Sequence, residues 1–186
     1  MDEPFAVKPT LTGERAVLRP MVASDAAALF ELVNDAESTR LTGTQQTFTR
    51  DQIASWAASR GDHADRLDLV IVDRADGAVV GEAVINDWDA TNRGCNFRIS
   101  IGPAGRDRGL GTEATRLVVD HVFTTTDAHR IGLDVLDFNP RAAHVYEKIG
   151  FTREGVLRDV LRWDGEYHGS IVMSVLRPEW EAALPR

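Results

Sequence analysis

The feature that most constrains the possible folds of this chain is a glycine-containing loop between a predicted strand and a predicted helix. The loop and the start of the helix read Arg106-Asp107-Arg108-Gly109-Leu110-Gly111-Thr112. The first turn of a helix has backbone N–H groups without intrahelical partners and carries the positive end of the helix dipole. Glycines allow the backbone to approach a ligand closely, and arginines suit phosphate oxygens. The sequence therefore predicts an anion site at this junction, of the kind that holds a pyrophosphate.

Length and composition predict one domain over residues 1–186. A chain of 186 residues with 43% hydrophobic residues can bury one core and is short for two ordinary domains. No run of about 18 apolar residues occurs, and the first residues lack the apolar core of a signal peptide. We therefore expect a soluble, cytoplasmic protein that does not act on a membrane.

Charge and cysteine content exclude several other classes of partner and cofactor. The net charge of −8, from 29 acidic and 21 basic residues, would repel a nucleic-acid backbone, and no basic patch is visible. The single Cys95 cannot form an internal disulfide, and no cysteines and histidines have zinc-site spacing. We expect no metal and no nucleic acid. The acidity mildly favours an amine that is cationic in solution, such as a polyamine, an aminosugar or a peptide N-terminus.

The hydrophobic period switches between that of helices and that of strands along the chain. Helices are predicted after Ser24, after the capping box that begins at Thr49, from Thr112 and from Pro140. A polar loop is predicted over 86–93. Strands are predicted over 16–19, 67–72, 79–85, 96–101, 130–136, 156–163 and 170–176. This order, β-α-α-β-β-β-α-β-α-β-β, predicts a mixed α/β (α+β) fold on one sheet.

Two separate blocks of the sequence resemble the GNAT superfamily of acyl-CoA N-acyltransferases. Residues 106–111 fit the family's pyrophosphate loop, Arg or Gln-x-x-Gly-x-Gly or Ala, and residues 139–151 match its Asn-x-x-Ala, Tyr and Gly-Phe segment. Residues 11–20 and 153–155 resemble the branch with ribosomal-protein N-terminal (alanine) acetyltransferases and spermidine acetyltransferase. The resemblance covers nearly the whole chain. It implies a mostly antiparallel central sheet of about seven strands with helices on both faces.

The resemblance also implies a function and a co-substrate. We expect an N-acetyltransferase that moves an acetyl group from acetyl-CoA directly to a primary amine of a small molecule or of a peptide or protein N-terminus. Backbone N–H groups of the loop would hold the pyrophosphate, strand residues would pair with the pantetheine arm, and an asparagine would reach its amides. The implied residues are Ile99, Ile101, Arg106, Asp107, Arg108, Gly109, Leu110, Gly111, Thr112 and Asn139. Such relatives commonly dimerise, so a homodimer is possible.

The resemblance assigns a general acid but leaves the base open. Tyr146 occupies the family's usual position for protonating the leaving thiolate, and the ordinary pKa of a phenol suits that task. Many relatives carry a glutamate where this chain has Asn96, which cannot accept a proton usefully. Glu82, Asp87 and Asp89 remain as alternative bases.

Acceptor-pocket residues are predicted from the segments around the presumed site. Trp88 is expected to wall the pocket from a polar loop, Asn96 to lie in it, and Tyr167 to border it after the last turn. The missing glutamate also supports a competing hypothesis. In that alternative, the chain is a non-catalytic acyl-CoA-binding regulatory module.

Overall fold

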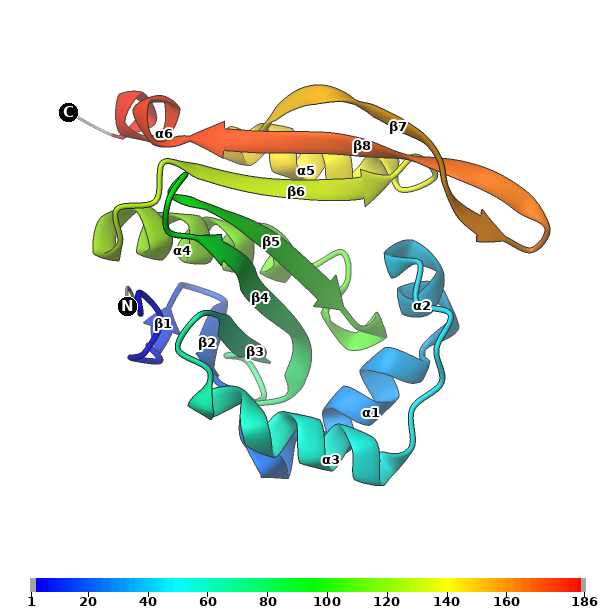
Figure 1. Cartoon of the computed structure of the whole chain (residues 1–186). Coiled ribbons are helices and arrows are strands. Elements are labelled where there is room, and N and C mark those ends of the chain that lie inside the picture. Colours follow the sequence, from blue (N-terminus) through cyan, green and yellow to red (C-terminus); the bar gives the residue numbers. More distant parts are fainter. Residues whose placement is uncertain (1–2, 185–186) are drawn as a thin grey trace.

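The predicted hairpins and crossovers form one eight-stranded sheet in the computed structural model, which describes residues 3–184 (Figure 1). The strand order is β1-β2-β3-β4-β5-β6-β8-β7. Every neighbouring pair is antiparallel except β5 and β6. The strands are β1 (Leu11–Thr12), β2 (Ala16–Pro20), β3 (Leu67–Asp73), β4 (Val79–Asp89), β5 (Gly94–Ile101), β6 (Arg130–Leu136), β7 (Thr152–Trp163) and β8 (Glu166–Leu176). The expected mostly antiparallel sheet is confirmed, with the two-residue β1 as an additional strand.

The helices include all four predicted from sequence and two more, α2 and α6. They are α1 (Ala26–Asn34), α2 (Ala36–Thr42), α3 (Arg50–Ser59), α4 (Leu110–Thr125), α5 (Pro140–Ile149) and α6 (Arg177–Ala183). The predicted capping box is confirmed at α3, where Thr49 Oγ1 accepts from Gln52 N and Gln52 Oε1 accepts from Thr49 N. No helix within residues 3–184 is long and apolar enough to cross a membrane.

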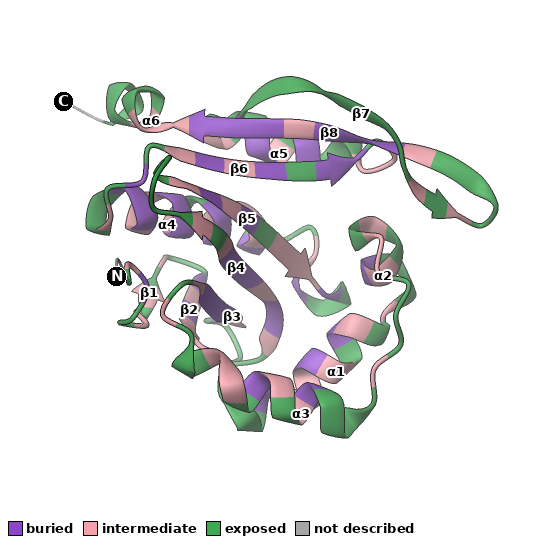
Figure 2. Ribbon diagram, viewed as in Figure 1, coloured by how far each residue is buried: buried purple, intermediate pink, exposed green. Residues whose placement is uncertain are grey.

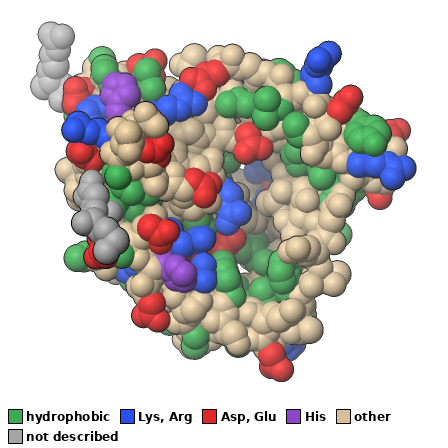
Figure 3. Space-filling view, in the orientation of Figure 1, with side chains coloured by type: hydrophobic (Ala, Val, Ile, Leu, Met, Phe, Trp, Pro, Cys, Tyr) green, Lys and Arg blue, Asp and Glu red, His purple; other side chains and the backbone are tan. Residues whose placement is uncertain are grey.

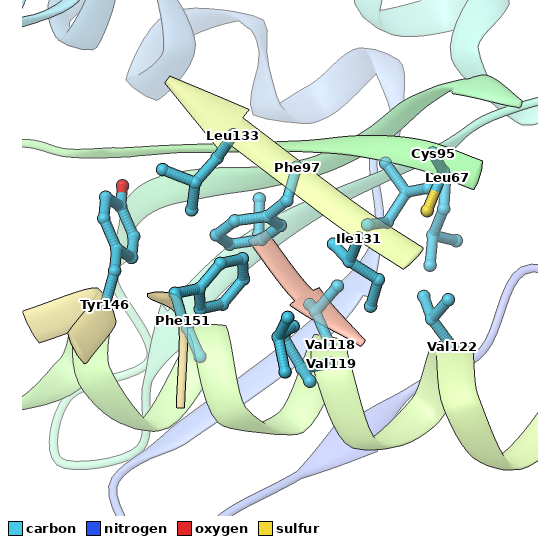
Figure 4. Packing of buried hydrophobic residues seen from close by; sticks show 14 of the residues in the cluster. Leu67, Cys95, Phe97, Val118, Val119, Val122, Ile131, Leu133, Tyr146 and Phe151 are labelled. Carbon is cyan, nitrogen blue, oxygen red and sulfur yellow. The ribbon is translucent and has the colours of Figure 1, made fainter. Parts of the chain in front are cut away.

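Helices cover both faces of the sheet, as expected. The larger core lies between the sheet and the pair α4 and α5, where Phe97, Val118 and Tyr146 are buried together. Figure 4 shows the α4 valines below the side chains of β5 and β6. On the opposite face, α1 and α3 bury a smaller cluster against β3, with Leu29 and Val70 inside it. Buried residues accordingly follow the central strands and the inner helix faces, whereas β7 is exposed along most of its length (Figure 2).

The parallel strands β5 and β6 separate after a short paired stretch. Their register joins only residues 94–96 to residues 130–132. Beyond Asn96 the two strands diverge, and Figure 1 shows their ends pointing apart. The separated halves leave backbone groups of both strands facing a gap, which positions the site described below.

The predicted polar loop over 86–93 is wrong in its first half. β4 continues through Asp89, with a shift of register between Asn86 and Asp89. Asn96 Nδ2 donates to Asn86 Oδ1 over 3.1 Å, so two polar side chains support this pairing. The turn itself closes on the Asp89 carboxylate, which accepts from the backbone of Thr91 and Asn92.

Candidate active site

A cavity of about 480 Å³ lies where β5 and β6 separate, beside the start of α4 and α5. Figure 3 shows this face of the molecule hollowed between β5 and α2. Eight of the ten predicted co-substrate residues line the cavity. They are Ile99, Ile101, Arg106, Asp107, Gly109, Gly111, Thr112 and Asn139. The other two lie elsewhere: Leu110 is buried in the larger core, and Arg108 faces away from the cavity wall.

The loop before α4 has the backbone conformation of an anion cradle. Asp107 and Gly109 have φ angles of 59° and 77°, and Gly109 is the N-cap of the 16-residue α4. A Cβ at Gly109 would lie 2.8 Å from Arg15 Nη1, and one at Gly111 would lie 3.2 Å from Ile101 Cγ1. Glycine is therefore required at the first position and favoured at the second. The free N–H groups of the first helical turn then face the cavity mouth.

The Arg106 guanidinium does not stand free for a phosphate. It pairs with Asp35 and Glu37 of α2 and donates to Ser38 Oγ over 2.8 Å. Its Nε donates to Ile101 O over 3.2 Å. The expected cation beside the loop is thus neutralised by two carboxylates, and Arg106 fastens the loop to α2.

Arg108 is paired in the same manner, on the other side of the loop. Its guanidinium forms an ion pair with Asp73 and donates to Ala104 O over 3.1 Å. With both loop arginines engaged, the backbone N–H groups remain as the anion donors. A third arginine at the cavity mouth was not predicted: Arg141 of α5 pairs with Asp107 over 2.8 Å and lines the cavity.

Asn139 and Tyr146 both reach the cavity from α5. Asn139 caps the helix, with Oδ1 accepting from Ala142 N over 3.2 Å, so its Nδ2 is the group left to donate to a ligand carbonyl. Tyr146 is 8% exposed and packs between Phe97 and Phe151. Figure 4 shows its hydroxyl pointing away from the helix that carries it. Burial, aided by the nearby Asp134 carboxylate, raises the pKa of Tyr146, so the hydroxyl stays protonated at neutral pH.

A second, smaller cavity of about 150 Å³ adjoins the first across β5. Ser38 and Thr42 of α2 and Arg98, Ile99 and Ser100 of β5 line both cavities. Glu82 of β4 lines the smaller cavity but not the larger one. The two hollows therefore meet at the middle of the splayed strand.

Glu82 is the candidate base that the structure places at a cavity. Its Oε2 is shielded from solvent and has no hydrogen-bond partner within residues 3–184. Burial raises the pKa of Glu82 to about 7, and the nearby Arg98 charge opposes that rise. A carboxyl group with such a pKa exchanges a proton readily near neutral pH.

The other candidate base, Asp87, lies at the surface. It sits at the irregular end of β4 with φ of 53°, where Asn86 Nδ2 donates to its Oδ2 over 2.9 Å. Asn96 turns toward Asn86 rather than toward either cavity. Neither Asp87 nor Asn96 lines a cavity, because the register shift of β4 turns this end of the strand away from the site.

The two predicted aromatic pocket residues also lie outside both cavities. Trp88 packs edge-on against Phe5, with ring centroids 5.9 Å apart, because β4 extends far enough to place the indole against the larger core. Tyr167 is 63% exposed on the β7–β8 hairpin, where the Arg162 guanidinium lies 6.0 Å from its ring centroid. Neither side chain lines either of the two cavities.

Arg98 and the α2 hydroxyl groups were missed by sequence reasoning. The signal for Arg98 was present: alternation along 96–101 places it on the opposite face from Ile99, the face that also carries Glu82. The signal for α2 was weaker. Asp35 accepts from Ser38 N over 2.8 Å as its N-cap, but the helix has only seven residues.

Comparison with known proteins places this geometry in a family. Residues 15–152, more than half of the chain, match the family model of the acetyltransferase (GNAT) domain. A stretch of 118 residues is 30% identical to the spermidine N(1)-acetyltransferase of Escherichia coli (strain K12), covering 63% of this chain and 63% of that protein. A stretch of 86 residues is 28% identical to the ribosomal protein uS5-alanine N-acetyltransferase of the same strain, covering 46% and 44%. The matched stretches span less than two thirds of these curated relatives.

A solved structure shares the fold over nearly the whole chain. The spermidine N-acetyltransferase from Vibrio cholerae, in complex with CoA and spermine, superposes with a TM-score of 0.84. The match covers 91% of this chain and 99% of that one, at 22% sequence identity. At this identity the likeness establishes the fold.

Proposed function

The chain belongs to the acetyltransferase (GNAT) family, and on that premise we propose that it is an N-acetyltransferase that transfers acetyl directly from acetyl-CoA to a primary amine. One observation carries the proposal: two cavities, one with an anion cradle and one with a buried carboxyl group, meet at Ile99 on the splayed strand β5. Holding two reactants in a well-aligned geometry lowers the activation barrier by up to roughly 7 to 11 kcal/mol. Placement of this kind supports direct transfer without a covalent enzyme intermediate.

The larger cavity fits acetyl-CoA. The first-turn N–H groups of α4 suit a pyrophosphate. The edge of β5 that β6 leaves unpaired beyond Asn96, at Ile99 above all because Ile101 O already accepts from Arg106, suits the amides of the pantetheine arm. Asn139 Nδ2 is a further donor to that arm. Bound there, acetyl-CoA supplies the activated acyl group as a thioester. Backbone N–H groups on β5 are placed to polarise a carbonyl in the gap.

Glu82 is the proposed base. In the transfer an N–C bond forms, the thioester C–S bond breaks, and the amine nitrogen loses a proton. Glu82 accepts that proton, because the pKa of about 7 caused by burial balances the charged and neutral forms near neutral pH. Its position on the smaller cavity places it across β5 from the donor side.

Tyr146 is the proposed partner of the departing thiolate. Because burial raises its pKa, the phenol stays protonated and opposes conversion to phenolate. A thiol has an ordinary pKa of about 8.5, below that of the phenol. Tyr146 therefore stabilises the thiolate mainly as a hydrogen-bond donor, with the final proton coming from solvent.

Binding and turnover test the proposal together. Isothermal titration with acetyl-CoA checks the donor site, and release of free thiol in the presence of an amine panel checks the transfer. We expect submillimolar acetyl-CoA affinity and thiol release that depends on the amine, with a mass gain of one acetyl group in the product. Absence of acetyl-CoA binding would remove the proposed co-substrate. Binding with no amine-dependent thiol release would favour the non-catalytic regulatory module.

The geometry weakens the case for that regulatory module. The module was motivated by Asn96, which replaces a glutamate, but Asn96 lies outside both cavities and Glu82 lies inside one. We also propose a single catalytic domain over residues 1–186, a cytoplasmic location and a homodimer. Light scattering coupled to size exclusion tests the homodimer.

A further inference from the structure

The smaller cavity carries one carboxyl group and one guanidinium on neighbouring strands. The register pairs Val84 with Arg98 and Glu82 with Ser100, so Glu82 and Arg98 are diagonal neighbours on one face of the sheet. The Cα atoms of diagonal neighbours lie about 7–8 Å apart, so both side chains border the same small space. A single small molecule in the smaller cavity can contact both groups.

Neither charged group forms an ion pair within residues 3–184, although the nearby Arg98 charge acts on Glu82 and opposes the rise in its pKa. Glu82 Oε2 has no hydrogen-bond partner, and the exposed Arg98 side chain forms no hydrogen bond or ion pair within residues 3–184. This contrasts with Arg106, Arg108 and Arg130, which each pair with a carboxylate. A cation left unpaired at the mouth of a cavity is available to an anionic group of a ligand.

The rest of the described cavity wall is uncharged. It combines hydroxyl groups with apolar side chains, from Leu32, Val33, Ser38, Thr39, Thr42, Thr44, Val84, Ile99 and Ser100. Of the carboxylates that line the adjoining cavity, Glu37 pairs with Arg106 and Asp107 pairs with Arg141, whereas Asp134 accepts, among the described residues, only from the Ser170 hydroxyl group. Within the smaller cavity, a linear polycation would meet one carboxyl group and one repelling guanidinium.

We propose that the acceptor is a small zwitterion, of the amino-acid class, whose amine faces Glu82 and whose carboxylate is bound by Arg98. The inference rests on the proposed function, because it names the acceptor for the same site. The acceptor carries an ammonium group, so its nitrogen first loses one proton, which Glu82 accepts and passes to solvent. The neutral amine then attacks the thioester carbonyl: the N–C bond forms, the C–S bond breaks, the nitrogen loses its second proton to Glu82, and the departing thiolate takes a proton from solvent. The carboxylate keeps its charge throughout, held by the bidentate geometry that guanidinium offers. The cavity volume of about 150 Å³ suits a compound of this size.

Matched pairs of acceptors test the assignment. Thiol release is measured with free amino acids, with their carboxamides and with spermidine, at saturating acetyl-CoA. For the preferred amino acid, kcat/KM should exceed that of its carboxamide by about tenfold or more, since a charge-assisted bond is lost in the amide. In Arg98→Met this ratio should collapse toward one, and in Arg98→Lys it should be intermediate. Arg162→Met, on the exposed hairpin, is the control that should keep the wild-type ratio.

Three results overturn the zwitterion assignment. The first is a higher kcat/KM for spermidine than for every amino acid. The second is an equal fall in kcat/KM for the amino acid and for its carboxamide in Arg98→Met, when that variant retains acetyl-CoA affinity and a wild-type melting temperature. If no amine releases thiol, the proposed function fails, and titration of amino acids into the CoA-bound protein decides the subsite separately. Binding that Arg98→Met abolishes supports it, whereas absence of binding is the third overturning result.

Discussion

Arg106 donates to Ser38 Oγ over 2.8 Å, and this contact joins the anion-binding loop to the helix that walls the smaller cavity. The same guanidinium pairs with Asp35 and Glu37, so α2 is held by charge as well as by packing. Ser38 lines both cavities. The donor loop and the acceptor wall therefore share one structural support.

Arg106→Ala should loosen α2 and weaken acceptor use more than acetyl-CoA binding. With its ionic support gone, a seven-residue helix opens more often, so amide hydrogen exchange over 36–42 should accelerate. We expect kcat/KM for the amine to fall about tenfold, while the backbone cradle keeps most of the acetyl-CoA affinity. Arg108→Ala, which breaks the pair with Asp73, is the control. Unchanged exchange over 36–42 would contradict the fastening role.

Glu113→Gln should destabilise the fold at neutral pH. The Glu113 carboxylate accepts from the backbone of Glu14, Arg15 and Ala16 over 2.7 to 2.9 Å. Burial opposes the charged form, but these three donors outweigh it and hold the pKa below its usual range. We expect a loss of about 1–2 kcal/mol in unfolding free energy at pH 7, measured by urea denaturation.

The loss of unfolding free energy in Glu113→Gln should depend on pH. Because the folded pKa of Glu113 lies below the unfolded value, its stabilisation is present above pH 4.5 and is lost as the pH falls through the folded pKa. The difference between wild type and Glu113→Gln should therefore shrink in acid. Glu14→Gln, which keeps its backbone N–H, should match wild type; a constant gap from pH 7 to pH 3 would argue against carboxylate-specific capping.

Tyr146→Phe should slow turnover and leave binding and folding intact. The ring contacts to Phe97 and Phe151 are kept, and only the hydroxyl is removed. We expect kcat to fall about 10²-fold, as for loss of one hydrogen-bond donor to a developing anion, with acetyl-CoA affinity and melting temperature near those of wild type. Tyr167→Phe on the exposed hairpin should behave as wild type. A full rate in Tyr146→Phe would remove the role assigned to the phenol.

Glu82→Gln should stabilise the protein in alkali while damaging its activity. Burial raises the folded pKa of Glu82 to about 7, so the fold favours the protonated carboxyl group. That contribution is complete below the unfolded pKa of 4.5 and is lost as the pH rises through 7. Gln mimics the neutral form, so the variant should melt higher than wild type at pH 8 and similarly at pH 4. Asp87→Asn, at the surface, should have the melting temperature of wild type at both pH values.

Local backbone rules made the donor side predictable from sequence. The glycines at 109 and 111, the amphipathic α4 that follows them and the start of α5 at Pro140 depend on neighbouring residues only, and they match the expectations from sequence. The partners of Arg106 did not follow from sequence. Its carboxylates come from Asp35 and Glu37, about seventy residues away, in a helix too short to give a clear periodic signal.

The residues of the acceptor side could not be predicted in the same way, because they depend on strand register, which is not evident from the sequence alone. Trp88 was expected in a loop that walls the pocket. Because β4 continues past Ile85 and successive strand residues point to opposite faces of the sheet, Trp88 instead packs against the larger core. The same register set Glu82 and Arg98 on one face. Alternation could suggest each residue separately, but their common cavity also needs α2, whose place is fixed by tertiary contacts.

The pH profile of amine-dependent thiol release, compared between wild type and Glu82→Gln, tests the central claim most directly. The wild-type kcat/KM should rise with an apparent pKa near 7, as the Glu82 carboxyl group ionises. Glu82→Gln should lose that limb and fall by roughly 10² to 10⁴-fold, with acetyl-CoA affinity retained. A variant with the wild-type rate and the same rising limb would contradict the claim that Glu82, on the wall of the smaller cavity, is the base.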